Sequence, residues 1–454
     1  MPDDIFDQIR AEVSETPIVR RVGRVTEVAR GTLLVTGLNT SASQGDQVAW
    51  ANGDDQQRGE IIRLTGQGAL VLPTGPTAGI AIGDPVIHIG PPRVAPHQGW
   101  LGRVVDPDGK PLDDRPLMSG LDVRRLDAPP PPAARRRPLG ERLETGLAVF
   151  NTLLPIVRGQ RLGLFSGSGI GKSTLLAKLA TGIDADVVVV ALVGERGREL
   201  REFTDRVMGN EGMRRTVVVA ATSDQSPLVR RRCLPTAMAV AEHFRDQGLH
   251  VLLLADSITR FAEAHREVAL ASGESASLRG YPPSTAHMIM SLCERAGPGT
   301  TDVGDISAVF TVLVAGSDMD EPIADILRGV LDGHIILDRS IAERGRYPAI
   351  DLLRSVSRSL PEAADADENA LIQMARRLLG AYDRSAIMIQ SGLYVQGADP
   401  EIDEAIRVFP RLDAFLSESE SDNTAASFER LKACLIQQAE SAGGRKKADR
   451  KKRP

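Results

Sequence analysis

The sequence predicts an α/β fold: a small β domain, then a largely parallel sheet covered by helices, then a helical domain. Three observations favour this organisation. Short β-rich runs alternate with Gly, Asn and Asp turns in residues 17–91, and near-continuous apolar runs alternate with helical segments in residues 140–360. After Pro361, apolar residues recur at helical spacing. A chain of 454 residues is also too long for one hydrophobic core.

The bulk composition excludes several classes of protein. Apolar content of 42% and charged content of 25% are ordinary for a globular protein, and a net charge of −5 gives no drive toward nucleic acid. The three cysteines are far apart, which indicates neither a disulfide framework nor a metal cluster and favours a reduced, cytoplasmic setting. No run approaches the ~20 apolar residues of a membrane span, so we expect any membrane association to be peripheral.

The first element expected is an amphipathic helix within residues 1–16, because Ile5, Phe6, Ile9 and Val13 share one helical face. Such a helix packs on its own barrel or docks a partner protein, and the pattern leaves both open. Residues 17–91 follow as a small barrel-like or sandwich-like β domain.

The next segment is a strand and turn at residues 100–109, followed by a proline-rich connector at residues 128–138 that must be largely extended. The central domain, residues 92–360, carries five apolar runs typical of strands buried on both faces. They are residues 162–165, 186–193, 216–220, 250–255 and 308–314. A helical domain at residues 361–440 and a basic tail at residues 441–454 complete the chain.

The most informative motif lies between the first of these strands and a helix. Its turn is rich in glycine and ends in a Lys-Ser pair, so that backbone N–H groups converge on phosphate oxygens and the helix N-terminus adds positive potential. Lys172 would reach the β- and γ-phosphates and the Ser173 hydroxyl would ligate Mg²⁺. The nucleotide-binding residues predicted are Ser166, Gly167, Ser168, Gly169, Ile170, Gly171, Lys172, Ser173 and Thr174.

Further charged residues follow strand ends and indicate hydrolysis. Asp256 ends a buried apolar run, where a carboxylate can hold a water on Mg²⁺; a helix-capping role is the alternative. Glu195 leaves a neighbouring strand and can orient or deprotonate the attacking water, with Arg196 beside the terminal phosphate. Arg358 lies in a Ser/Arg stretch and can stabilise the transferred phosphoryl group of a neighbouring subunit.

Together these motifs resemble the catalytic subunits of rotary-type ATPases, and most closely the ATPases of type III protein export. The resemblance spans about residues 17–420 and rests on residues 158–176, 194–200, 221–227, 256–262, 279–284, 320–325 and 331–339. It implies a barrel, a RecA-like core and a helical C-terminal domain. Residues 397–406 resemble the flagellar branch more than the injectisome branch. The chain departs from the family at Ser166, Asn151 and Ala315, where relatives usually carry Gly, Asp and Glu.

The resemblance also implies roles for individual residues. Lys172, Glu195, Arg196 and Arg358 match the catalytic positions, Ser173 and Asp256 the magnesium positions, and Tyr347 the aromatic that stacks on adenine. ATP and Mg²⁺ are then the ligands expected. The partners implied are five further copies in a homohexamer, a stator-like regulator at the N-terminal helix, chaperone–substrate complexes and the membrane export gate.

Three alternatives stay open: an injectisome ATPase, the catalytic subunit of a proton-translocating ATP synthase, and an RNA-dependent RecA-like helicase. A synthase subunit would need a non-identical partner subunit. A helicase should present basic and aromatic residues on its β domain, whereas residues 17–91 carry a single aromatic residue, Trp50.

Overall fold

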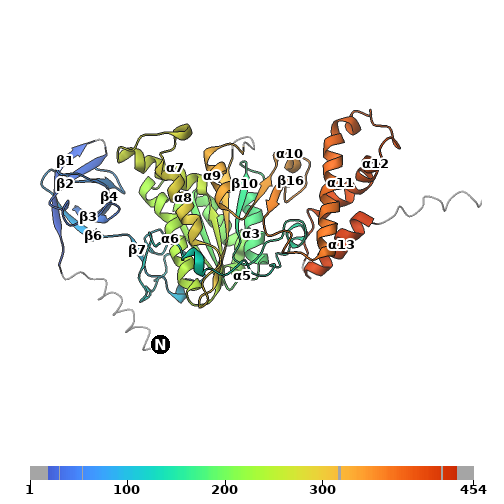
Figure 1. Ribbon diagram of the computed structural model, residues 1–454. Coiled ribbons are helices and arrows are strands. Elements are labelled where there is room, and N and C mark those ends of the chain that lie inside the picture. The colour runs from blue at the N-terminus through green and yellow to red at the C-terminus, as the bar shows by residue number, and fades with distance from the viewer. Residues whose placement is uncertain (1–18, 30, 54, 315–318, 421–422, 437–454) are drawn as a thin grey trace, which may run out of the picture.

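The computed structural model describes residues 19–436, apart from residues 30, 54, 315–318 and 421–422. The expected N-terminal docking helix, the basic tail and Ala315 therefore lie outside the described residues. Three units follow one another along the molecule: a small barrel, a broad sheet with helices on both faces, and a group of C-terminal helices (Figure 1). The predicted fold class is confirmed. Among the described helices, none is both long and apolar enough to cross a bilayer.

The N-terminal unit is a closed antiparallel barrel with strand order β1-β2-β5-β4-β3-β6. Its strands are β1 (Val22–Ala29), β2 (Thr32–Thr36), β3 (Gln47–Asn52), β4 (Asp55–Leu64), β5 (Ala69–Pro73) and β6 (Pro85–Gly90). Alternate side chains point inward, including Val25, Val35 and Trp50, and fill the interior. Pairing of β1 with β6 closes the ring and leaves no free edge.

The central unit is an eight-stranded sheet with order β16-β15-β10-β14-β13-β11-β12-β8. Its strands are β8 (Arg103–Val105), β10 (Arg161–Ser166), β11 (Val187–Glu195), β12 (Thr216–Thr222), β13 (His250–Asp256), β14 (Asp305–Leu313), β15 (Gly333–Leu337) and β16 (Ile350–Ser357). Every neighbouring pair is parallel except β15 and β16. All five apolar runs singled out in the sequence form strands of this sheet.

Helices cover both faces of the sheet. They are α2 (Ala148–Asn151), α3 (Lys172–Gly182), α4 (Gly197–Glu202), α5 (Gly209–Met213), α6 (Pro227–Arg245), α7 (Ile258–Ala271), α8 (Ser284–Arg295), α9 (Pro322–Val330) and α10 (Arg339–Glu343), with a π-helical turn at Phe203–Met208. In β11, Val188 and Val190 pack toward α3, whereas Val187 and Val189 pack toward α6. This double burial explains why the strands read as unbroken apolar runs.

The C-terminal unit consists of α11 (Ala366–Gln390), α12 (Pro400–Phe415) and α13 (Thr424–Ile436). Asp365 and Glu368 form a capping box that begins α11. The rings of Tyr382 and Phe409 stack at 3.7 Å between α11 and α12. The apolar side chains of these helices belong to the same buried cluster as those of α3, so this unit packs on the α3 face of the sheet.

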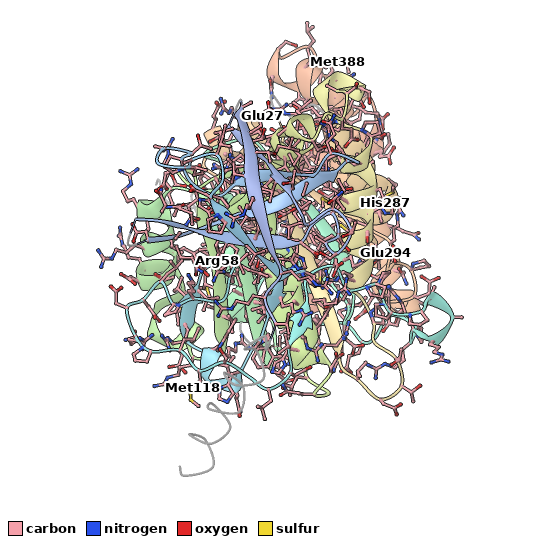
Figure 2. All side chains as sticks on the ribbon, turned by 90° about the vertical axis from the view of Figure 1, so that its left-hand side faces the viewer. Glu27, Arg58, Met118, His287, Glu294 and Met388 are labelled. Carbon is pink, nitrogen blue, oxygen red and sulfur yellow. The ribbon has the colours of Figure 1, made fainter. Side chains whose placement is uncertain are left out.

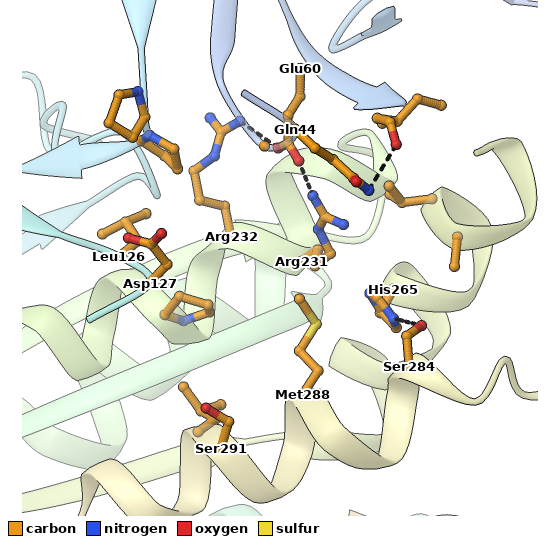
Figure 3. Close-up of a pocket in the computed structure, with 18 of the residues that line it drawn as sticks. Gln44, Glu60, Leu126, Asp127, Arg231, Arg232, His265, Ser284, Met288 and Ser291 are labelled. Carbon is orange, nitrogen blue, oxygen red and sulfur yellow. Dashed lines mark hydrogen bonds and ion pairs between the residues drawn. The ribbon is translucent and has the colours of Figure 1, made fainter. Parts of the chain in front are cut away.

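Charged side chains join the barrel to the central unit. The carboxylate of Glu60 on β4 contacts Arg231 and Arg232 on α6, and Arg232 also binds Asp108 at 2.6 Å. Arg58, also on β4, places its Nη1 3.5 Å from Oδ2 of Asp108. Figure 2 shows Arg58 in a view from the barrel end of the molecule. A cavity of about 730 Å³ opens beside the junction, between β4 and the helices α6, α7 and α8 (Figure 3).

The proline-rich connector is extended except for a single 3-10 turn at Ala133–Arg135. Its arginines hold it to the central unit: Arg136 donates to the carbonyl of Ala296, and Arg137 pairs with Asp305 at 2.8 Å.

Candidate functional site

The glycine-rich turn connects the end of β10 to the start of α3 in the middle of the sheet. Gly169 and Gly171 have φ angles of +78° and +88°, which favour glycine and let the backbone curl into a cradle. Ser166 is fully buried, and its hydroxyl has no hydrogen-bond partner among the described residues. Ser166 therefore offers no side-chain atom at the surface of the turn, and its carbonyl accepts the N–H of Val314. The side chains of Ser168, Ser173 and Thr174 are exposed at the surface of the turn and of the first turn of α3.

Lys172 and Asp256 meet at the base of the turn. The Lys172 ammonium contacts Oδ1 of Asp256, and the two side chains are only 11% and 5% exposed. Thr311 on β14 donates its hydroxyl to the same oxygen at 2.7 Å. Since Ser173 adjoins Lys172, a hydroxyl and a carboxylate lie at one edge of the sheet, and such oxygen donors suit Mg²⁺ held jointly with phosphates.

Glu195 ends β11, next to β13 in the sheet. Burial is the main reason that its pKa rises from 4.5 to about 7; a hydrogen bond with Glu199 and the charge of Asp256 raise it further, against the lowering effect of Arg260 and Lys172. A carboxyl group with a pKa near 7 in a site of this kind is typical of a general base.

Arg260 fixes the position of Glu195. It lies in the first turn of α7, donates to the carbonyl of Gly194 and places its Nη2 3.5 Å from Oε2 of Glu195. Arg196, in contrast, points outward: its side chain is 71% exposed and pairs with Glu199 at 3.5 Å.

Tyr347 lies against the glycine-rich turn, although 176 positions separate it from Gly171 in the chain. A Cβ added to Gly171 would lie 3.3 Å from Cδ1 of Tyr347, and the tyrosine is 51% exposed. An exposed ring beside the turn offers a flat surface on which a base can stack.

Arg358 lies at the opposite end of the sheet. Its backbone N–H bonds the carbonyl of Asp332, whose carboxylate holds Arg161 at the start of β10, whereas Lys172 follows the end of β10. The exposed guanidinium donates to the carbonyl of Arg328 at 3.1 Å. β10 has 6 residues and is therefore about 20 Å long, so Arg358 cannot reach the glycine-rich turn of its own chain.

The structure thus brings together Lys172, Glu195 and Asp256. It adds Arg260 and Thr311, two functional residues that no sequence motif predicted. The position of Arg260 in its helix could have indicated its role from the sequence. A cation in the first turn of a helix faces the positive end of the helix dipole, so it calls for an acidic partner nearby. Thr311 carries no such signal, because its partner depends on strand register.

Comparison with known proteins identifies two family models along the chain. The model described as "ATP synthase alpha/beta family, nucleotide-binding domain" matches residues 146–357, and the "T3SS EscN ATPase C-terminal domain" matches residues 364–435. The flagellum-specific ATP synthase of Caulobacter vibrioides is 44% identical over 89% of this chain and 93% of its own length. The SPI-2 type 3 secretion system ATPase of Salmonella typhimurium is 41% identical over 93% of this chain and 96% of its own length.

A solved structure agrees with these relatives. The assembled ATPase EscN of the enteropathogenic E. coli type III secretion system is 33% identical, with a TM-score of 0.84. It covers 91% of this chain and 100% of its own.

Proposed function

Because this chain belongs to the ATP synthase alpha/beta family, among the type III export ATPases, we propose that it hydrolyses ATP to drive flagellar protein export. The single observation that carries the hydrolytic site is the convergence of Lys172, Glu195 and Asp256 at the carboxyl ends of β10, β11 and β13. Parallel sheets bind ligands at this edge.

The roles follow from chemistry and position. Backbone N–H groups of residues 167–172 would bind the phosphates, and Lys172 would move from Asp256 to the β- and γ-oxygens. Ser173 and Asp256 would hold Mg²⁺, which when bound neutralises charge on the phosphates. Glu195, oriented by Arg260, would accept the proton of the attacking water. Arg196 is exposed on the same strand end, so it contacts the terminal phosphate only by turning inward.

Arg358 would complete the site of a neighbouring subunit. Its distance from its own glycine-rich turn supports this assignment, because a guanidinium at the far end of the sheet can meet only another chain's γ-phosphate. The assembled EscN structure supports a ring of copies, and we extend it here to a homohexamer. Tyr347 would stack on the adenine.

The partners proposed follow the family. EscN has also been solved in complex with its central stalk EscO, which supports a stalk or stator-like regulator for this chain. We propose residues 1–16 as the docking point of the stator-like regulator, chaperone-bound export substrates as the cargo, and the cytoplasmic side of the membrane export gate as the location. Relatives named flagellum-specific ATP synthase support the flagellar branch. The equally similar SPI-2 relative keeps an injectisome role as the second candidate.

The test is ATP turnover measured against protein concentration for the wild type, Glu195→Gln and Arg358→Ala. Arg354→Ala serves as the control, since Arg354 is also exposed and lies on β16, the strand that ends just before Arg358. We expect a superlinear wild-type curve, near-normal turnover for the control and nearly inactive Glu195 and Arg358 variants. Full activity of Arg358→Ala would rule out a site shared between subunits. Strong stimulation of ATP turnover by RNA would favour the helicase alternative.

A further inference from the structure

Thr311 lies on the interior of the sheet, in a position where an apolar side chain would be expected. It is fully buried on β14 and pairs across the strand with Leu164 of β10. Two residues earlier, Val309 belongs to the apolar cluster on the α3 face, together with Leu254 of β13. A hydroxyl at such a position is costly unless it is hydrogen-bonded, so the partner that it has among the described residues matters.

That partner is Asp256. The Thr311 hydroxyl donates to Oδ1 of Asp256 at 2.7 Å, and Lys172 contacts the same oxygen. Among the described residues, no donor is bonded to Oδ2 of Asp256. The carboxylate is therefore held through one oxygen, and the other stays available for a metal-bound water.

The two donors to Oδ1 differ in what happens when nucleotide binds. In the function proposed above, Lys172 leaves Asp256 to bind the phosphates, whereas Thr311 is fixed within a central strand. We infer that Thr311 is a positioning residue: its hydroxyl keeps the Asp256 carboxylate directed at the magnesium site after Lys172 has moved. This inference rests on the proposed role of Asp256 at that site.

The size of the effect follows from the kind of bond. A hydrogen bond to a charged group changes an equilibrium by roughly 10- to 100-fold. Without the Thr311 hydroxyl, nucleotide affinity should fall only when Mg²⁺ is present, because the hydroxyl bonds Asp256. A purely structural threonine would instead weaken binding equally with and without the metal.

The experiment measures the affinity for a fluorescent ATP analogue with Mg²⁺ and with EDTA, for the wild type and for Thr311→Val, Thr311→Ala, Thr311→Ser and Asp256→Asn. The thermal midpoint of each variant reports folding. We expect the hydroxyl-free variants to lose roughly 10-fold or more of the Mg²⁺-dependent gain in affinity and to keep their affinity in EDTA. Thr311→Ser should keep the gain to within about three-fold, because it retains the hydroxyl.

Two results would overturn the inference: an unchanged Mg²⁺-dependent gain in both Thr311→Val and Thr311→Ala, or a loss in Thr311→Ser as large as in Thr311→Val. Asp256→Asn distinguishes a failure of the proposed metal-site role of Asp256 from a failure of the positioning role of Thr311. If it also leaves the gain unchanged, the assignment of Asp256 to the metal site is wrong. If it abolishes the gain while the Thr311 variants do not, only the role of Thr311 fails.

Discussion

Replacing Glu195 with Gln should stabilise the folded chain while it removes the proposed general base. The pKa of Glu195 is raised to about 7, mainly by burial. The folded protein therefore binds the carboxyl proton more tightly than the unfolded chain does. The stability contributed by this proton is fully present below pH 4.5 and is lost as pH rises through about 7. Glutamine has nearly the same shape and carries no charge at any pH, so Glu195→Gln escapes this loss.

The magnitude follows from the pKa values. The rise from 4.5 to about 7 corresponds to about 3 kcal/mol of unfolding free energy, at about 1.4 kcal/mol per pKa unit. The Glu195 side chain is 13% exposed, and solvent that reaches it screens the neighbouring charges. We therefore expect the advantage of Glu195→Gln over the wild type to grow by about 1–2 kcal/mol between about pH 5.5 and about pH 8.5.

The assay is the thermal midpoint of the nucleotide-free protein at the two pH values, where this change corresponds to a few degrees. Glu202→Gln is a matched control, because Glu202 is an exposed carboxyl on the adjacent helix α4. An advantage of Glu195→Gln that is the same at both pH values, or no larger than that of the control, would refute the assignment of a buried, proton-binding Glu195.

Three further predictions concern other parts of the molecule. Arg358→Ala and Lys172→Ala should each lose roughly 10³-fold of ATP turnover. An equimolar mixture of the two should recover about a quarter of wild-type turnover, because that share of sites combines an intact half from each variant; no recovery would contradict a site shared between subunits. Tyr347→Ala should raise the KM for ATP roughly three- to ten-fold, whereas Tyr347→Phe should leave it near the wild-type value; an equal rise in both would argue against ring stacking. Glu60→Gln should weaken the docking of the barrel by about 2 kcal/mol, because Arg231 loses its charged partner and Arg232 keeps Asp108 as its charged partner; limited proteolysis of the barrel checks this against the exposed Glu27→Gln, and equal cleavage of the two would contradict it.

Much of the candidate site could be predicted because its parts are local in the chain. The turn, the strand before it and the helix after it are contiguous between residues 161 and 182, and their chemistry needs no distant partner. Asp256 and Glu195 each end an apolar run, and the carboxyl ends of parallel strands meet at one edge of a sheet. These placements follow from strand order alone.

The rest depends on tertiary geometry that no local pattern encodes. Thr311 meets Asp256 only because β14 lies beside β13 in one particular register. Glu60 and Arg231 are separated by 171 positions, so their contact depends on how the barrel packs on α6. Tyr347 is placed against the turn by the loop between α10 and β16. In each case the chemistry of the residue type could be anticipated, whereas its neighbour could not.

The separation of Arg358 from Lys172 within one chain has a consequence for the cell. A newly made copy would carry one half of each of two different sites. Alone, it would complete neither of them. Dispersed copies would then hydrolyse little ATP, and hydrolysis would begin only where copies have assembled into a closed ring. The length of a six-residue strand would in this way act as a safeguard against wasteful turnover far from the place of export.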